Sequence, residues 1–303
     1  MPHWGEVLTE IQGTKVANPL DTIRRKYLQI MHKYTKRNII AYYSGFLQRS
    51  NANSAIDEND KNALMQAVYG LDKSKGLDLI LHTPGGDIAA TESIVTYLRS
   101  IFGKNIRAFI PQIAMSAGTM IALSCKEIVM GKQSNIGPID PQFGGMSCAG
   151  VIEEFNKALE SVKTDPTSIP IWQVIISKYH PTFLGDCQKA IEWSNTMIVD
   201  WLTTNMLSNH KNPKDDATKI VSKLGSHKDT FTHSKHIHID ECRELGINVT
   251  PLESLDKVSI DGCKDLQDCV LTIHHTYMHT FSNSTAIKVV ENHLGSAMII
   301  NTK

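Results

Sequence analysis

The stretch AMSAGTMIALSCKEIVMGKQSNIGPIDPQ, residues 114–142, decides the fold and carries the candidate nucleophile. Ser116 stands near its start, inside eighteen residues, 108–125, that contain no charged side chain. The pattern predicts that a strand ends before Ser116 and that a helix begins there, which leaves backbone N–H groups without helical partners. A serine in this position is either a helix cap or a nucleophile beside N–H groups that stabilise an oxyanion.

A second turn, LHTPGGD at residues 81–87, supports the nucleophile interpretation. Pro84 ends a short apolar strand, and Gly85 and Gly86 can adopt backbone conformations that are closed to other residues. N–H groups of Ala117 and of one of these glycines would form an oxyanion hole for acyl transfer. The PGG turn and the serine stand about thirty residues apart across one strand–helix–strand unit, so we read them together.

Strands and helices alternate regularly from residue 76 onwards. We expect strands at 76–83, 105–112 and 127–131, and helices at 88–102 and 116–124, which together indicate a parallel sheet with right-handed crossovers. Upstream, the pattern predicts a helix over 18–37, a strand over 38–47 and a helix over 57–73. Downstream, residues 149–163 and 183–207 read as helices, and the tail, 284–300, reads as a further helix.

Composition narrows the class of protein. The 303 residues carry 31 acidic and 31 basic side chains, so no basic surface indicates nucleic-acid or membrane-surface binding. The uncharged run at 108–125 is interrupted by Pro111, Gln112 and Gly118, which argues against a stable membrane span. The first residues, MPHWGEVLTEIQ, show no basic region followed by an apolar core, so we expect no export, and the six scattered cysteines read as free thiols. We therefore expect a cytoplasmic protein.

The two motifs resemble the serine dehydrogenase proteinase family, which belongs to the ClpP/crotonase superfold and is related to signal peptide peptidase A. Segments such as RNIIAYYSGFL, SKYHPTFLGDCQKAIEW and STAIKVVENHLG also resemble that family. The resemblance implies an α/β fold, a spiral of ββα units with additional helices at the N-terminus and in the C-terminal half. Residues 1–70 would be an extension packed on a 71–303 core domain, with a helical insert at about 150–225. It also implies a homo-oligomer: a dimer, a trimer or a ring.

The same resemblance implies an ATP-independent serine peptidase that acts on peptide or protein substrates without a cofactor or a metal. Ser116 matches the family nucleophile, and Gly85, Gly86 and Ala117 match the oxyanion donors. Asp140 stands where ClpP has its histidine, so it would be the orienting acid of a Ser–Asp–His order. The base would then come from SHKDTFTHSKHIHID, for which we favour His233 with His227 as second choice; His236 and His238 are also present.

Several alternatives remain open at the level of the sequence. A serine–lysine dyad would use Lys157, or else Lys163 or Lys178, although Lys157 stands among glutamates in an amphipathic helix. A crotonase-like enzyme that handles acyl-CoA would use the glycine turn without a nucleophile. A non-catalytic, ring-forming scaffold would explain the missing histidine at position 140. The HSKHIH segment has ligand-like spacing without the partners of a standard zinc site, and no GxGxxG turn supports dehydrogenation.

Overall fold

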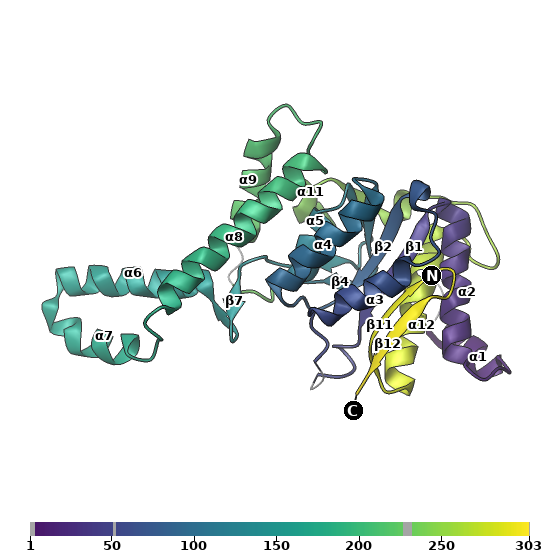
Figure 1. Cartoon of the computed structure of the whole chain (residues 1–303), viewed down its shortest axis with the longest axis horizontal. Helices are drawn as coiled ribbons and strands as arrows, with labels where there is room; N and C mark the ends of the chain where they lie inside the picture. Colours follow the sequence, from purple (N-terminus) through teal and green to yellow (C-terminus); the bar gives the residue numbers. More distant parts are fainter. Residues whose placement is uncertain (1–3, 51–52, 227–231, 303) are drawn as a thin grey trace.

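The computed structural model describes residues 4–50, 53–226 and 232–302 and shows a mixed α/β fold around a seven-stranded sheet (Figure 1). Its strands follow the order β10-β5-β3-β2-β1-β11-β12. The first five pair in parallel, and β11 and β12 add antiparallel strands at one edge. In that order the bounds are Val249–Pro251, Glu127–Met130, Ile106–Ile110, Leu77–His82, Asn38–Ser44, Ala286–Asn292 and Ala297–Asn301. β1, which comes from the first seventy residues, thus lies inside the sheet.

A small second sheet runs beside the first and reveals the repeating unit. It contains β4 (Ile113–Ala114), β6 (Asn135–Ile136) and β9 (Ile237–His238). β3 is followed by β4 and then by α5 (Ala117–Leu123), and β5 is followed by β6. Each of these two consecutive strand pairs thus contributes its first strand to the large sheet and its second strand to the small sheet. After β2, Thr83 forms a single bridge with Ala114 before α4 (Ile88–Phe102) begins. The predicted α/β fold with ββα units is confirmed.

Helices cover both faces of the large sheet (Figure 1). Leu77, Leu79 and Leu81 of β2 pack into a core with α3 (Asn59–Val68), α4 and α5, whereas Ile80 points into the opposite core. This alternation follows from the two-residue period of a strand. The second core lies beneath α2 (Pro19–Thr35) and α12 (Leu266–Asn283), with α1 (Trp4–Gly13) packed outside them.

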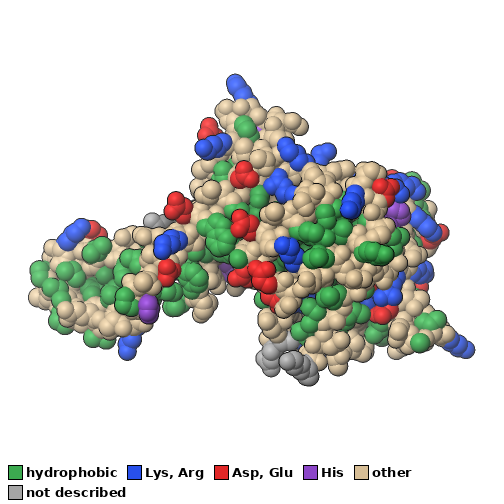
Figure 2. All heavy atoms as spheres, in the orientation of Figure 1, with side chains coloured by type: hydrophobic (Ala, Val, Ile, Leu, Met, Phe, Trp, Pro, Cys, Tyr) green, Lys and Arg blue, Asp and Glu red, His purple; other side chains and the backbone are tan. Residues whose placement is uncertain are grey.

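The segment after β6 forms a helical arm that projects from the body (Figure 1). It begins with a hairpin, β7 (Gln142–Phe143) and β8 (Met146–Ser147), and continues through α6 (Cys148–Thr164) and α7 (Ile169–Ile176). α8 (Phe183–Thr204) then returns to the body, where α9 (Pro213–Leu224) and α11 (Ile239–Glu244) follow. α7, with the sequence IPIWQVII, has no buried side chain, and hydrophobic side chains gather on the arm in Figure 2. None of the described helices is long and apolar enough to cross a bilayer.

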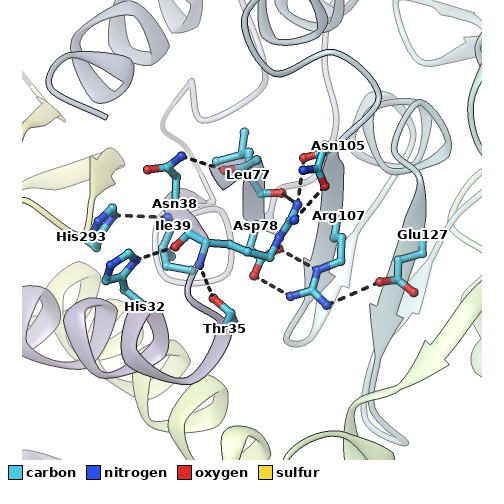
Figure 3. Close-up of polar contacts among 12 residues, drawn as sticks. His32, Thr35, Asn38, Ile39, Leu77, Asp78, Asn105, Arg107, Glu127 and His293 are labelled. Atoms are coloured by element: carbon cyan, nitrogen blue, oxygen red, sulfur yellow. Dashed lines mark hydrogen bonds and ion pairs between the residues drawn. The ribbon is translucent and has the colours of Figure 1, made fainter. Parts of the chain in front are cut away.

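A polar network ties together the amino ends of the parallel strands, opposite the ends that carry the motifs (Figure 3). The buried carboxylate of Asp78 in β2 accepts hydrogen bonds from Arg37 Nε at 2.6 Å and from Arg107 Nε and Nη2, each at 2.7 Å. Arg107 also pairs with Glu127 of β5 at 3.5 Å. Bidentate, charge-assisted contacts of this kind fix the geometry of three neighbouring strands.

The prediction of a helix over the tail, residues 284–300, is wrong. β11 and β12 form an antiparallel hairpin there, and every residue of β11 is buried. In the sequence, Lys288 and Glu291 are three residues apart, which is the spacing of polar side chains on the exposed face of a helix. Instead, Lys288 Nζ lies 3.0 Å from Asp60 Oδ2, and Glu291 Oε1 lies 2.6 Å from Arg24 Nε. Long-range ion pairs thus allow charged residues in a fully buried strand, β11, among β-branched neighbours.

Candidate active site

Ser116 has a strained backbone and a side chain that caps nothing. It follows β4 and occupies the N-cap position of α5, with φ 50° and ψ −115°, but its hydroxyl makes no capping hydrogen bond. Among the described non-glycine residues, positive φ values occur otherwise only at Lys36 and Asp261. α5 is buried along its whole length, so the strained residue is held firmly at the edge of a cleft. This combination argues against a simple cap and for a functional constraint.

The glycine turn lies against the nucleophile candidate. Gly85 has φ 102°, and a Cβ atom added to it would come within 2.6 Å of the Ser116 Cβ. Gly86 has φ 158°, and a Cβ there would lie 2.3 Å from backbone atoms of Ile56. Only glycine permits this conformation at Gly85 and this close approach at both positions.

Two backbone donors at this turn remain available. The Gly85 N–H donates to Thr83 Oγ1 at 3.2 Å. The N–H groups of Gly86 and Ala117 donate to none of the residues that the structure describes. Pre-positioned N–H groups of this kind are what an oxyanion requires.

Asp140 and His233 lie together. His233 Nδ1 is 2.7 Å from Asp140 Oδ1, with the carboxylate buried and the ring partly exposed. Strand register explains this contact: β6 pairs antiparallel with β9, with Ile136 opposite Ile237. The same register, continued four residues beyond each strand, puts Asp140 opposite His233. The resemblance favoured His233, but the sequence alone could not settle the choice, because the pairing joins segments about a hundred residues apart.

The remaining histidines have other surroundings. His227 lies outside the described residues. His236 Nδ1 contacts Asn135 Oδ1 at 2.6 Å, and His238 is exposed on β9. His82, at the end of β2, points into the second core, where its ring centroid lies 5.1 Å from that of His274. Burial lowers the pKa of His82 to about 3, so its ring stays neutral at physiological pH.

A cleft of about 840 Å³ joins these parts. Ser116, Asp140 and His233 line it together with Gly85 and Gly86, whereas Ala117 is buried behind Ser116. Lys157, Lys163 and Lys178 are exposed on the arm and do not line it. A lysine base needs a desolvated position near the nucleophile, so these three lysines lack the geometry for a dyad.

Sequence reasoning missed the second wall of the cleft, which α8 supplies. Asp186, Lys189, Ala190 and Trp193 line it from one face of that helix. Lys189 is 81% exposed and lies 3.8 Å from Asp186, so it is a solvated ion pair rather than a buried base. Spacing of three, four and seven residues would reveal a common helix face, but nothing in the sequence says that this face meets the serine.

The structure also bears on the histidine-rich segment as a metal site. Within residues 4–50, 53–226 and 232–302, no three His, Cys, Asp or Glu side chains are arranged to hold a metal ion. All six cysteines are buried free thiols.

A cleft that brings a serine, a histidine and an aspartate together in a ClpP-like α/β fold is typical of the serine hydrolases. A model of the family described as ClpP-like SDH-type serine proteinase matches residues 52–256. Because this match covers more than half of the chain, the protein belongs to that family.

Two relatives come from the archaeon Methanocaldococcus jannaschii. The uncharacterized protein MJ1495 is 33% identical over 194 residues, which is 64% of this chain and 59% of the relative. The uncharacterized protein MJ0137 is 30% identical over 195 residues, which is 64% of this chain and 60% of the relative. The match thus spans about three fifths of these curated relatives.

Proposed function

We propose that this protein is a serine peptidase that cleaves peptide bonds through an acyl-enzyme on Ser116. The observation that carries the proposal is the 2.7 Å contact between His233 Nδ1 and Asp140 Oδ1 in the cleft that Ser116 also lines. An imidazole held by a buried carboxylate beside a serine is the arrangement that activates a hydroxyl nucleophile.

In the proposed reaction, Ser116 Oγ attacks the peptide carbonyl carbon while His233 Nε2 accepts the hydroxyl proton. Asp140 accepts the Nδ1–H hydrogen bond, which fixes the ring orientation and stabilises the imidazolium. The N–H groups of Gly86 and Ala117 stabilise the oxyanion, and Gly85 allows the turn to approach the serine closely. His233 then gives the proton to the leaving amine, and water hydrolyses the ester by the same steps in reverse order.

We further propose that the peptidase works in the cytoplasm, without ATP or a cofactor, as a homo-oligomer. The six free, buried thiols suit a reducing compartment. The apolar side chains of α7 support self-association, because Ile171 is 65% exposed and Val174 is 62% exposed. Exposed apolar surface on a projecting element is typical of a protein interface.

Fluorophosphonate labelling of the purified protein tests the proposed function, because the reagent reacts with an activated serine. We expect wild type to label and Ser116→Ala to lose labelling completely. His233→Ala should lose it as well, whereas His227→Ala and Lys157→Ala should label like wild type. Labelling that survives His233→Ala but not Lys157→Ala would replace the triad by a lysine dyad. No labelling of wild type would contradict the peptidase.

A further inference from the structure

The wall that α8 contributes is chemically divided along its length. Asp186 and Lys189 lie in the first two turns of the helix, with side chains 47% and 81% exposed, and Trp193, 40% exposed, lies one turn after Lys189. The cleft is also lined by Met120, one helical turn after Ser116, and by Ile139, which precedes Asp140; both are buried. Apolar side chains therefore line the same cleft as the nucleophile candidate.

Each acidic or lysine side chain that lines the cleft already has a partner. Asp140 holds His233, and Asp186 lies 3.8 Å from Lys189. Asp87 accepts the hydrogen bond of the Ala90 N–H at the start of α4. Each of these groups thus already makes a polar contact, although Asp140 Oδ2 is buried without a hydrogen bond, and a charged substrate side chain would have to compete for them. Burying such a side chain without a partner is unfavourable.

The position of α8 beside the cleft is fixed by its packing against α6 and α5. Ala190 belongs both to the cleft and to a small core with Cys148, Val151 and Cys187, which fixes α8 on α6. α8 also packs against α5, the helix that begins after Ser116. The start of α6 is in turn tied to the acid, because the Cys148 N–H donates to the Pro141 carbonyl at 2.9 Å.

We infer that Trp193, with Met120 and Ile139, forms a subsite that receives a large apolar side chain adjoining the bond that Ser116 attacks. Trp193 is its specificity-determining residue. Side chains of an extended peptide alternate between its two sides, so one side chain next to the scissile carbonyl faces a wall of the cleft. The substrate class is a peptide with leucine, phenylalanine or a similar residue at that position. This inference rests on the proposed peptidase function.

Peptidyl coumarylamides that differ only in the residue forming the scissile amide (Leu, Ala or Asp) test the subsite. We expect wild-type kcat/KM to fall in the order Leu, Ala, Asp. Trp193→Ala should lower kcat/KM for the Leu substrate about tenfold through KM, because much of the apolar contact is lost. The Ala substrate should change less than about threefold, and Trp193→Phe should restore most of the loss. Trp4→Ala is the matched control, since Trp4 is 43% exposed and lies on α1 outside the cleft.

Equilibrium dialysis of the same compounds against Ser116→Ala, with and without Trp193→Ala, separates the subsite from the reaction. Preferential binding of the Leu compound that depends on Trp193 would support the subsite even if wild type hydrolysed nothing, in which case only the peptidase proposal fails. If Trp193→Ala lowers kcat/KM equally for all three substrates, or if wild type favours the Asp substrate, the subsite is overturned. The peptidase proposal is unaffected by either result. If the compounds are neither bound nor hydrolysed, both the subsite and the peptidase proposal are overturned.

Discussion

Replacing Asp140 by asparagine tests the central contact of the proposed site with little change of shape. The carboxylate is buried and lies 2.7 Å from His233 Nδ1, so in the proposed mechanism it would stabilise the imidazolium that forms when Ser116 attacks. For charge centres about 4 Å apart at an effective dielectric constant of about 20, the Coulomb energy is about 4 kcal/mol. That energy corresponds to about a thousandfold in rate. An asparagine N–H facing His233 would also select the wrong tautomer and lower the rate further.

The assay is the second-order rate constant of fluorophosphonate labelling, measured on protein whose folding is verified by circular dichroism. Asp186→Asn is the matched control: it removes a carboxylate from the same cleft, but one that is 47% exposed and paired with Lys189. We expect that control to label within about threefold of wild type, because an exposed ion pair contributes about 0–1 kcal/mol. If Asp140→Asn also labels within tenfold of wild type, Asp140 does not support the base and the triad assignment is wrong.

Three further predictions concern the turn, the sheet and the arm. Gly85→Ala should lower stability by about 2–5 kcal/mol in urea unfolding, from strain and crowding, and should abolish labelling of the folded fraction, whereas Gly13→Ala, with open space around it, should do neither. Asp78→Asn should cost about 3–5 kcal/mol of unfolding free energy, because it leaves two guanidinium groups without their buried partner; a loss below 1 kcal/mol would refute this. Val174→Asp should lower the mass measured by light scattering if α7 is an oligomer contact, whereas Val258→Asp, at 60% exposure on the body, should not.

The central ββα units could be predicted from the sequence because their signals are local. The strand over 76–83 and the helix over 88–102 correspond to β2 (Leu77–His82) and α4 (Ile88–Phe102). Apolar runs, the PGG turn and helical spacing are each recognised within a window of about fifteen residues. In this segment all three predict the same strands and helices. The position of Ser116 at a strand–helix junction followed from the same signals.

The parts that failed or stayed open depend on contacts that are remote in the sequence. The tail was misread because the charges of Lys288 and Glu291 are neutralised by residues more than two hundred positions away. His233 could be favoured but not selected, since only the pairing of β6 with β9 sets it opposite Asp140. No periodicity encodes such pairings, so a single sequence cannot supply them.

The small sheet is what holds the candidate site together. Ser116 follows β4, Asp140 comes four residues after β6, and His233 comes shortly before β9. The glycine turn joins the same sheet through Thr83, which exchanges backbone hydrogen bonds of 3.0 and 3.1 Å with the β4 segment.

Each strand of that sheet is only two residues long, so pairing alone holds it weakly. One buried side chain reinforces it: Thr119 Oγ1 donates to the Ala114 carbonyl and accepts from the Gly137 N–H, both at 2.9 Å. Thr119 therefore links the strand before Ser116 to the loop that leads to Asp140. The two sheets also share one hydrophobic core, which contains Ala114, Ile136 and Ile237 of the small sheet. The ion pairs of Asp78 secure the opposite ends of the large sheet's parallel strands. Different polar contacts thus hold the two ends of the strands: Thr119 links the segments that carry Ser116 and Asp140, whereas Asp78 ties the amino ends together.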